Sequence, residues 1–415
     1  SHLYTFTPLH FHTFTPQYFR FILLSMRYRK KYVFIAACLG MFLFGITIIS
    51  LGCILPDIIS RYQINEIAAG TLAALLPLGI LTGSIVFGPV TDRFGHKYLL
   101  IICSFLIMIA LEGIAFSQNF LLLKLNIFII GFSGGFVNGS TNTLVNDISS
   151  EGRSANLSLL GVFFGIGALG MPLLIGIFTE LLSADLIIAA IGLLMILPII
   201  YFFFVQFPDP KISRNYPLKE SFRMLKDPAL LLMGFFLFLE GGLEGITNNW
   251  TTTYLQNWLI EEKQQTLYAL SAFVLSLTLT RLLLGFILRK IPSYLVQIIS
   301  ILIAFTGILI LKLNSTYNFT VFGLILLGMG FACGFPIILG YVGELFKKFS
   351  GTAFGIVLVI SLIGNMIINY SMGLIIHHFG IKHFSSLLLI CLILLLVMFY
   401  LVLRNIRQKI DIQSV

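Results

Sequence analysis

Two carboxylic acids and an amide recur at four-residue spacing inside an apolar run near 229–255, at Glu240, Glu244 and Asn248. Residues four apart share one face of a helix, so these side chains form a stripe. A carboxyl in apolar surroundings, with a second carboxyl one turn away, favours its protonated form. Glu244, with Glu240 as its neighbour, is therefore the candidate for a coupling proton. The alternative is a structural pair bridged to Arg281, the candidate charge partner.

A second polar stripe lies in an apolar run near 119–145, where Asn138 and Asn142 are followed by Asn146. Amide side chains donate and accept hydrogen bonds, as sugar hydroxyls require. Trp250 and Tyr254 follow the acidic stripe and can stack on a sugar ring. The candidate substrate-binding residues are Asn138, Asn142, Asn248, Trp250 and Tyr254. The alternatives are interhelical hydrogen bonds for the asparagines and anchoring at the membrane interface for the two aromatic residues.

No enzyme constellation accompanies these stripes, since P-loop, His-Glu-x-x-His and Cys-x-x-Cys patterns are missing from the sequence. The five cysteines all lie in apolar runs, which favours small buried side chains over a disulfide or metal site. We expect no enzyme activity, no metal and no cofactor. Without an ATP site, an ion gradient must drive any transport. We expect the coupling ion to be a proton, with sodium as the alternative.

The elements that carry the stripes are membrane spans. The 415-residue chain is 58% hydrophobic and only 10% charged, whereas a soluble domain is roughly a quarter charged. A membrane helix needs about 20 mainly apolar residues. Twelve such runs occur, near 32–55, 68–90, 98–116, 119–145, 155–178, 185–206, 229–255, 266–288, 294–312, 319–343, 351–374 and 384–404. The continuous runs predict an all-α membrane protein and argue against a β-barrel, whose strands alternate.

Lysine and arginine give the orientation. With the N-terminus inside, the cytoplasmic segments hold nineteen of them, including Arg27, Arg93, Lys211 and Arg404, and the opposite side holds only Arg61, Lys124, Lys263, Lys312 and Lys382. This asymmetry obeys the positive-inside rule and predicts that both termini are cytoplasmic. The net charge of +9 then reflects membrane topology, and we expect no nucleic acid partner.

The longest polar connection divides the spans into two sets of six. The expected domains are an N-terminal extension and basic segment (1–31), a first bundle (32–206), a cytoplasmic linker (207–228), a second bundle (229–405) and a cytoplasmic tail (406–415). Glycines nine residues apart, at 167 and 176 and again at 364 and 373, suggest an internal duplication. Residues 1–25 are expected to precede the natural start at Met26, with a functional amphipathic arm as the alternative.

The loop after the second span carries a specific motif, in which Gly88, Asp92, Arg93, Gly95 and Lys97 fall at fixed spacing. It resembles the G-x-x-x-D-R-x-G-R-K loop of the major facilitator superfamily, with His96 in place of an arginine. The resemblance implies two six-helix halves, a substrate cavity between them and transport by alternating access. We call these five residues the gate motif, since the resemblance implies a contact that holds the halves together in one state.

Several segments are similar to the fucose–galactose–glucose:proton symporter branch of that superfamily. They are the fourth span around Gly134–Asn142, the fifth around Gly165–Leu173, Gly242 to Tyr254 in the seventh, Arg281 with Gly285, and Phe335-Pro336, which should kink the tenth span. The resemblance implies that spans one, four, seven and ten line the cavity. Two positions depart from the branch: Asn138 replaces a frequent carboxylate, and Phe164 replaces an amide.

These features predict a secondary active transporter that imports a hexose or related polyol with protons. The alternative is a proton-driven exporter of amphiphilic compounds, whose cavity should be mostly aromatic and apolar with one carboxylate. A membrane receptor is a third hypothesis, which would leave the gate motif without a purpose. We expect a monomer in a bacterial cytoplasmic (inner) membrane, with the lipid bilayer and a small-molecule substrate as its partners.

Overall fold

The computed structural model describes residues 28–149, 153–209, 224, 226–259, 261–313, 316–346 and 350–413. Within these ranges, twelve segments are helical, long and apolar enough to cross a membrane, which confirms the predicted all-α fold. The proposed extension at 1–25 and the centre of the 207–228 linker lie outside the described residues.

The first six spans are α2 (Lys30–Tyr62), α3 (Glu66–Phe94), α4 (His96–Phe116), α5 (Phe120–Ile148), α6 (Arg153–Phe178) and the pair α7 (Ala184–Leu194) and α8 (Ile196–Phe204). The second six are α10 (Pro228–Trp258), α11 (Lys263–Ile287), α12 (Ser293–Leu313), the pair α13 (Tyr317–Phe331) and α14 (Gly334–Leu345), α15 (Ser350–Phe379) and α16 (Phe384–Gln413), with the short helix η2 (Ile381–His383) before the last.

Local chemistry sets several of these boundaries. The second half starts at Asp227, whose carboxylate accepts hydrogen bonds from the backbone N–H groups of Ala229 and Leu230, and Pro228 follows at the first helical position. Both features favour a helix start. The tenth span breaks after Phe331, just before the Phe335-Pro336 pair expected to kink it. Helix α16 continues beyond its apolar run to Gln413, since backbone hydrogen bonds continue where hydropathy falls.

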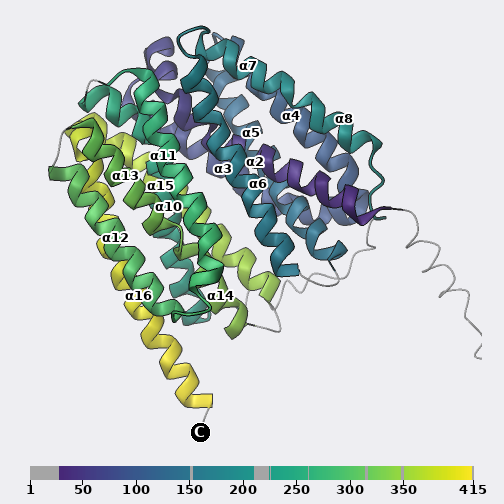
Figure 1. The fold of residues 1–415 in the computed structure, drawn as a ribbon, viewed down its shortest axis with the longest axis vertical. Coiled ribbons are helices and arrows are strands. Elements are labelled where there is room, and N and C mark those ends of the chain that lie inside the picture. Colours follow the sequence, from purple (N-terminus) through teal and green to yellow (C-terminus); the bar gives the residue numbers. More distant parts are fainter. Residues whose placement is uncertain are drawn as a thin grey trace, which may run out of the picture.

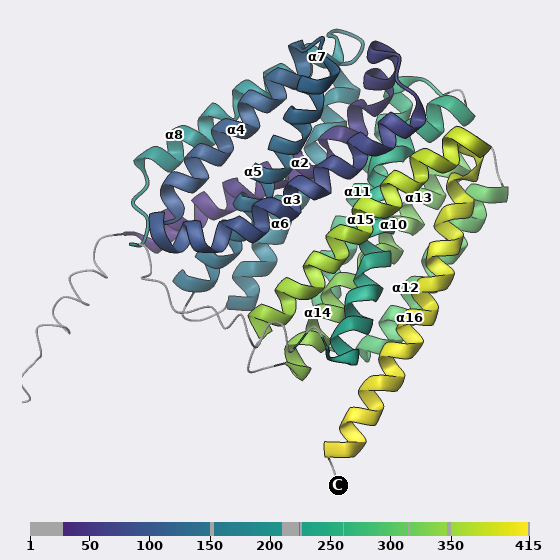
Figure 2. The same ribbon diagram turned by 180° about the vertical axis from the view of Figure 1, so that it is seen from behind.

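The two halves lie side by side in Figures 1 and 2, with α2–α8 in purple to teal and α10–α16 in green to yellow. The paired glycines play matching roles in them. A Cβ on Gly167 would lie 2.1 Å from the carbonyl oxygen of Phe42 on α2, and a Cβ on Gly364 would lie 2.1 Å from that of Phe238 on α10. Each therefore fits closely against the first helix of its own half.

The second glycine of each pair faces the other half. Gly176 of α6 lies against Tyr268 of α11, and Gly373 of α15 lies against Gly70 of α3. In each half, the first glycine of the pair thus contacts its own half and the second contacts the other half. This correspondence agrees with the duplication that the glycine spacing suggested.

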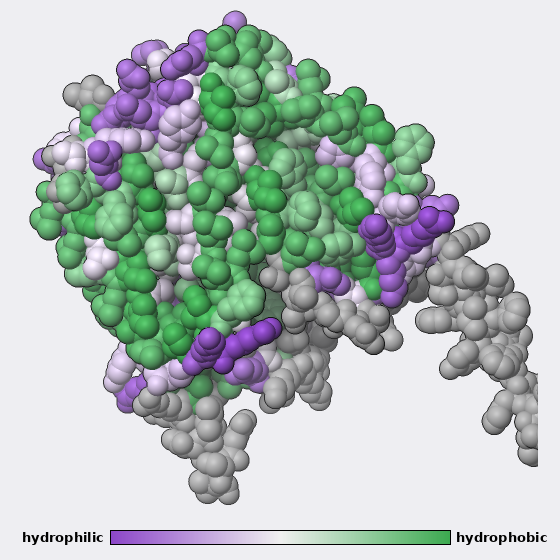
Figure 3. Space-filling view, viewed as in Figure 1, coloured by the Kyte–Doolittle hydropathy of each residue, from purple (hydrophilic) through white to green (hydrophobic). Residues whose placement is uncertain are grey.

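The outer surface of the bundle is apolar. Figure 3 shows hydrophobic residues across its middle and hydrophilic residues gathered toward its ends. Large apolar side chains such as Leu121, Leu181 and Phe204 are at least 75% exposed. Apolar side chains can face lipid without a penalty. Backbone N–H and C=O groups cannot, so each must be hydrogen-bonded within a helix.

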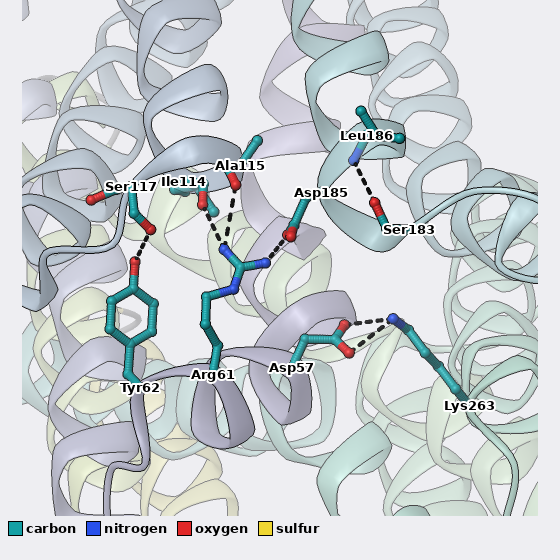
Figure 4. Close-up of polar contacts among 10 residues, drawn as sticks. All are labelled: Asp57, Arg61, Tyr62, Ile114, Ala115, Ser117, Ser183, Asp185, Leu186 and Lys263. Atoms are coloured by element: carbon teal, nitrogen blue, oxygen red, sulfur yellow. Dashed lines mark hydrogen bonds and ion pairs between the residues drawn. The ribbon is translucent and has the colours of Figure 1, made fainter.

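Because successive spans alternate in direction, Arg29, Arg93, Arg289 and Arg404 lie at one end of the bundle, which we call the basic end. At the opposite end polar contacts join the halves, and we call it the closed end. There Lys263 Nζ lies 2.7 Å from Asp57 of α2, as Figure 4 shows. His377 Nδ1 lies 3.1 Å from Glu66 of α3.

Backbone contact reinforces the closed end. The Thr252 hydroxyl of α10 donates to the Gly52 carbonyl of α2 at 2.6 Å. A Cβ on Gly52 would lie 2.0 Å from the Asn248 carbonyl oxygen, so only glycine permits this approach. Figure 4 also shows Arg61, which pairs with Asp185 and donates to the Ile114 and Ala115 carbonyls, all within the first half.

The Asp57–Lys263 pair should hold the closed end shut. Both side chains are about 30% exposed or less, and such pairs contribute about 0.2–1 kcal/mol. We expect Asp57→Asn to raise the maleimide labelling rate of Cys53, which is 2% exposed, by about 1.5- to 5-fold. The measurement uses a background in which the other four cysteines are alanine.

Asp185→Asn is the matched control for this experiment, because it breaks an ion pair at the same end that lies within one half. Unchanged labelling in Asp57→Asn, or an equal increase in Asp185→Asn, would contradict a role for the pair in closure.

Candidate functional site

A cavity of about 450 Å³ lies between the two halves. The first half contributes Met41 and Phe44 from α2 and Gly161 and Phe164 from α6. The second half contributes Glu244 from α10, Leu277, Thr278, Arg281 and Leu282 from α11, and Phe335, Pro336 and Leu339 from α14. One wall is thus wholly apolar, and the only charged residues among those that line the cavity are Glu244 and Arg281.

The Glu244–Arg281 ion pair joins α10 to α11 on the cavity wall. Arg281 Nη2 lies 2.8 Å from Glu244 Oε2, and the side chains are 27% and 15% exposed, respectively. A charge at membrane depth is costly unless it is paired, so each residue stabilises the ionised form of the other. Arg281 Nε is buried and makes no hydrogen bond in the described structure. The guanidinium therefore has donor capacity that Glu244 does not use.

Glu240 lies one turn from Glu244 and is not among the residues that line the cavity. It is 2% exposed, and its Oε1 has no hydrogen-bond partner among the described residues. A Cβ on Gly334 would lie 2.5 Å from that oxygen, so the carboxyl sits against the first residue of α14. The break in the tenth span thus receives Glu240, and glycine at 334 leaves room for it.

The predicted asparagine stripe on α5 is present but lies off the cavity wall. Asn142 Nδ2 donates to Asn138 Oδ1 at 2.9 Å, and both side chains are half-buried. On the same helix, Thr141 lies against Gly40 of α2. Asn142 Nδ2 also donates to the Asn138 carbonyl at 2.9 Å. The predicted role of the two asparagines in binding a solute stays a prediction.

The structure does not bring the other predicted binding residues to the cavity. Asn248 is buried where α10 meets Gly52, near the closed end. Trp250 is fully buried. The Tyr254 hydroxyl donates to the Leu311 carbonyl at 3.4 Å, and its ring centroid lies 4.9 Å from that of Phe384. The Tyr254 ring therefore packs inside the second half, and neither ring is among the residues that line the cavity.

The gate motif lies at the basic end, where α3 meets α4. Gly95, between the two helices, has φ of 79°, a positive value that glycine adopts readily and other residues rarely do. Arg93 is exposed beside the Phe94 ring, and Lys97 Nζ lies 5.7 Å from the centroid of Phe203. The side chain of Asp92 and the surroundings of Gly88 lie outside what the structure describes. The gating role therefore stays a prediction.

His96, where the motif departs from its usual arginine, is buried. Its Nδ1 lies 2.9 Å from the Ser140 hydroxyl of α5. The substitution thus replaces a basic loop residue with a packed one that ties α4 to α5.

Sequence reasoning missed most of the cavity wall. Phe44, Phe164, Thr278 and Gly161 line it, yet no polar periodicity distinguishes them from residues that face lipid. In the sequence, Phe164 stands out only as a departure from a family pattern. A usable signal is the cation Arg281, since a charge in a span usually faces the interior or a wet cavity.

The ion pair predicts a coupled response to mutation. Arg281→Gln leaves the Glu244 carboxyl without its partner, and we expect it to destabilise the protein by about 1–3 kcal/mol. Adding Glu244→Gln should recover at least half of the loss, because two amides can hydrogen-bond. Thermal unfolding of the four proteins in detergent micelles measures this double-mutant cycle. Additive losses in the double variant would show that the pair is not coupled.

Comparison with known proteins identifies the family of this fold. The model of the Major Facilitator Superfamily matches residues 37–293 and 261–411. Among curated proteins, the glucose/mannose transporter GlcP of Bacillus subtilis (strain 168) is 23% identical over 351 residues, covering 80% of this chain and 85% of GlcP.

Two solved structures show the same fold. A bacterial homologue of the human lysosomal transporter Spinster, in an inward-facing and unoccupied conformation, has a TM-score of 0.77 at 13% identity and covers 90% of this chain and 97% of its own. A mutant of the nucleoside transporter NupG has a TM-score of 0.75 at 18% identity, over 90% of this chain and 99% of its own. The chain therefore belongs to the Major Facilitator Superfamily, and it is a membrane transporter rather than an enzyme.

Proposed function

We propose that this protein is a secondary active transporter that moves a small organic solute with protons, by alternating access to the cavity between its halves. The observation that carries the proposal is the Glu244–Arg281 pair, the only charged residues on an otherwise mainly apolar wall. The driving force is an ion gradient, because no nucleotide-binding motif occurs in the sequence.

Glu244 binds the coupling proton in this mechanism. When it is ionised, Arg281 has its partner at 2.8 Å. When it takes a proton, the guanidinium loses that partner and the net charge of the cavity rises by one. Glu240, one turn away, is buried and unpartnered at Oε1, where ionisation is costly, so Glu244 is the carboxylate that pairs with Arg281. Proton binding and solute binding therefore influence one another through Arg281.

Alternating access follows from the contacts between the halves. Asp57–Lys263, Glu66–His377 and the Thr252–Gly52 hydrogen bond hold the closed end in the conformation described. Release of these contacts, together with closure of the basic end through the gate motif, would expose the cavity to the other side. The positive-inside rule supports a basic end in the cytoplasm. We propose a monomer in a bacterial inner membrane, with both termini cytoplasmic.

The character of the cavity favours an amphiphilic solute. The residues that line it are mostly aromatic and apolar, with one carboxylate. An exporter of amphiphilic compounds is expected to have such a cavity. The sugar hypothesis placed asparagines there instead. A hexose or polyol imported with protons is nonetheless the second candidate, supported by the relation to GlcP and by the half-buried Asn138–Asn142 pair on α5.

Transport in proteoliposomes tests the proposal. Labelled glucose, galactose and fucose, and a fluorescent amphiphilic dye, are offered with a pH gradient, with a sodium gradient and with none. We expect movement of at least one solute that depends on the pH gradient. Glu244→Gln should abolish gradient-driven movement while sparing exchange of solute across the membrane, because only exchange needs no proton release.

Glu112→Gln is the control for that substitution, because Glu112 lies on α4 beside Gly192 of α7, in the first half and off the cavity wall. Full accumulation by Glu244→Gln would refute its role in coupling. Movement that follows only a sodium gradient would refute proton coupling itself.

Filling the cavity should block transport without unfolding the protein. A Cβ on Gly161 meets no atom within 4 Å, and this residue lines the cavity. We expect Gly161→Leu to lower gradient-driven transport at least about tenfold while leaving the Tm unchanged or higher, since leucine favours helices more than glycine does by roughly 1 kcal/mol.

The matched control is Gly170→Leu on the same helix, where a Cβ also meets no atom within 4 Å but which is not among the residues lining the cavity. If Gly161→Leu and Gly170→Leu transport solute equally well, the solute does not pass through this cavity.

A further inference from the structure

We propose that the solute is an organic anion, with an aromatic or otherwise apolar body and one carboxylate or sulfonate group, which binds Arg281 while Glu244 holds a proton. This inference rests on the proposed proton-coupled transport and names its substrate class. It is carried by the arrangement of donors, charge and aromatic surface on the cavity wall.

The hydrogen-bonding capacity of the wall favours an acceptor-rich ligand. A guanidinium has five N–H donors in a planar fork. Nη2 reaches Glu244, while Nε is buried without a partner. The hydroxyl of Thr278 already donates its proton to the Val274 carbonyl at 2.8 Å. The free donors on the wall therefore belong to Arg281, whose fork matches a carboxylate or sulfonate bidentately.

Charge balance selects the sign of the ligand. With Glu244 ionised the pair is neutral, and a bound anion would leave the cavity with one negative charge. With Glu244 protonated, Arg281 is an unpaired cation among apolar groups, which is costly. An anion that binds at that point restores neutrality. One proton and one monoanion thus bind together, whereas an organic cation would add to the charge of Arg281.

Other ionisable groups near the pair do not change this balance. Glu240 lies one turn away on α10, and Cys333 lies at the α13–α14 break. Glu240 is buried and unpartnered at Oε1, beyond the wall that lines the cavity. A carboxyl or thiol buried in this way is costly to ionise, so neither group adds a charge to the balance.

The remaining wall suits an aromatic body. Phe44 and Phe164 of the first half have ring centroids 5.6 Å apart at 39°. Phe335, Leu277 and Leu339 face them from the second half. The volume of about 450 Å³ falls within the roughly 300–1,000 Å³ of small-molecule sites. A ligand held by Arg281 and these rings would contact both halves at once.

A polyhydroxylated ligand fits this wall less well. Each buried hydroxyl without a partner costs about 1–3 kcal/mol. Glu244, Thr278 and Arg281 are the only polar side chains among those lining the cavity, and a monosaccharide carries several hydroxyls that both donate and accept.

Calorimetric titration of the full chain in detergent micelles tests the inference, with naphthalene-2-sulfonate as the probe. Its neutral match is naphthalene-2-sulfonamide, its cationic match is 2-naphthylmethylammonium, and empty micelles correct for partitioning. We expect the sulfonate to bind at least tenfold more tightly than either. Titration at neutral pH in two buffers of different ionisation enthalpy should show uptake of about one proton per sulfonate bound. The sulfonate itself cannot take that proton.

Variants assign the two roles. Arg281→Gln should weaken sulfonate binding at least tenfold while leaving sulfonamide binding unchanged. Glu244→Gln should retain sulfonate binding without proton uptake. Arg281→Lys, which keeps the charge but loses the fork, should give intermediate affinity. If Arg281→Gln does not fold, ligand preference and proton uptake of the unaltered chain still decide the question.

Equal affinity for the three ligands, tighter binding of the ammonium, or sulfonate binding without proton uptake would overturn the inference. Gradient-driven transport of neutral solutes with no preference for anions would do so while leaving the proposed function standing. Proton-linked sulfonate binding in a protein that moves no solute along a pH gradient would instead support the anion site and refute the proposed function.

Discussion

Close backbone approach at glycine holds this bundle together, because apolar side chains gain little from contacting one another instead of lipid. Gly45, Gly83, Gly167 and Gly364 each lie where a Cβ would come within 2.4 Å of a carbonyl oxygen on a neighbouring helix. Such contacts add dispersion energy and leave no space for a side chain. They also fix which face of each helix points inward, and so determine which residues reach the cavity.

The cavity follows from an interruption of that close packing. Along α6, Gly165 and Gly167 lie tightly against α11 and α2, while Gly161 faces open space. One helix thus packs against both halves over part of its length and lines the cavity over the rest. The charged pair sits on the facing helices α10 and α11, which belong to one half. Protonation therefore acts directly on the second half, and the first half contributes only uncharged residues to the cavity.

The fold could be predicted well from the sequence and the site only in part. Apolar run lengths located all twelve spans, because a bilayer imposes one length and one composition on every helix. The residues that differ from this background, Glu244 and Arg281, were found for the same reason. The aromatic wall was not, since Phe44 and Phe164 resemble the residues that face lipid.

Position along a stripe misled the prediction as well. Trp250 and Tyr254 continue the helix of Glu244, but α10 runs 31 residues and leaves the cavity before it reaches them. Helical spacing gives the face of a residue and not its depth. Depth depends on how the two halves meet, and that depends on contacts between residues distant in sequence, such as Gly70 with Gly373.

The contact of Gly52 with the Asn248 carbonyl has a mechanical consequence. It lies near the closed end of α2, a helix that begins at Lys30. The intervening stretch of helix is about 33 Å long at 1.5 Å per residue. If this contact acts as a fulcrum, a rigid tilt of about 10° there displaces the far end of α2 by about 6 Å. A small rotation of α2 about this contact would therefore move the other end of the helix by about the width of a small solute.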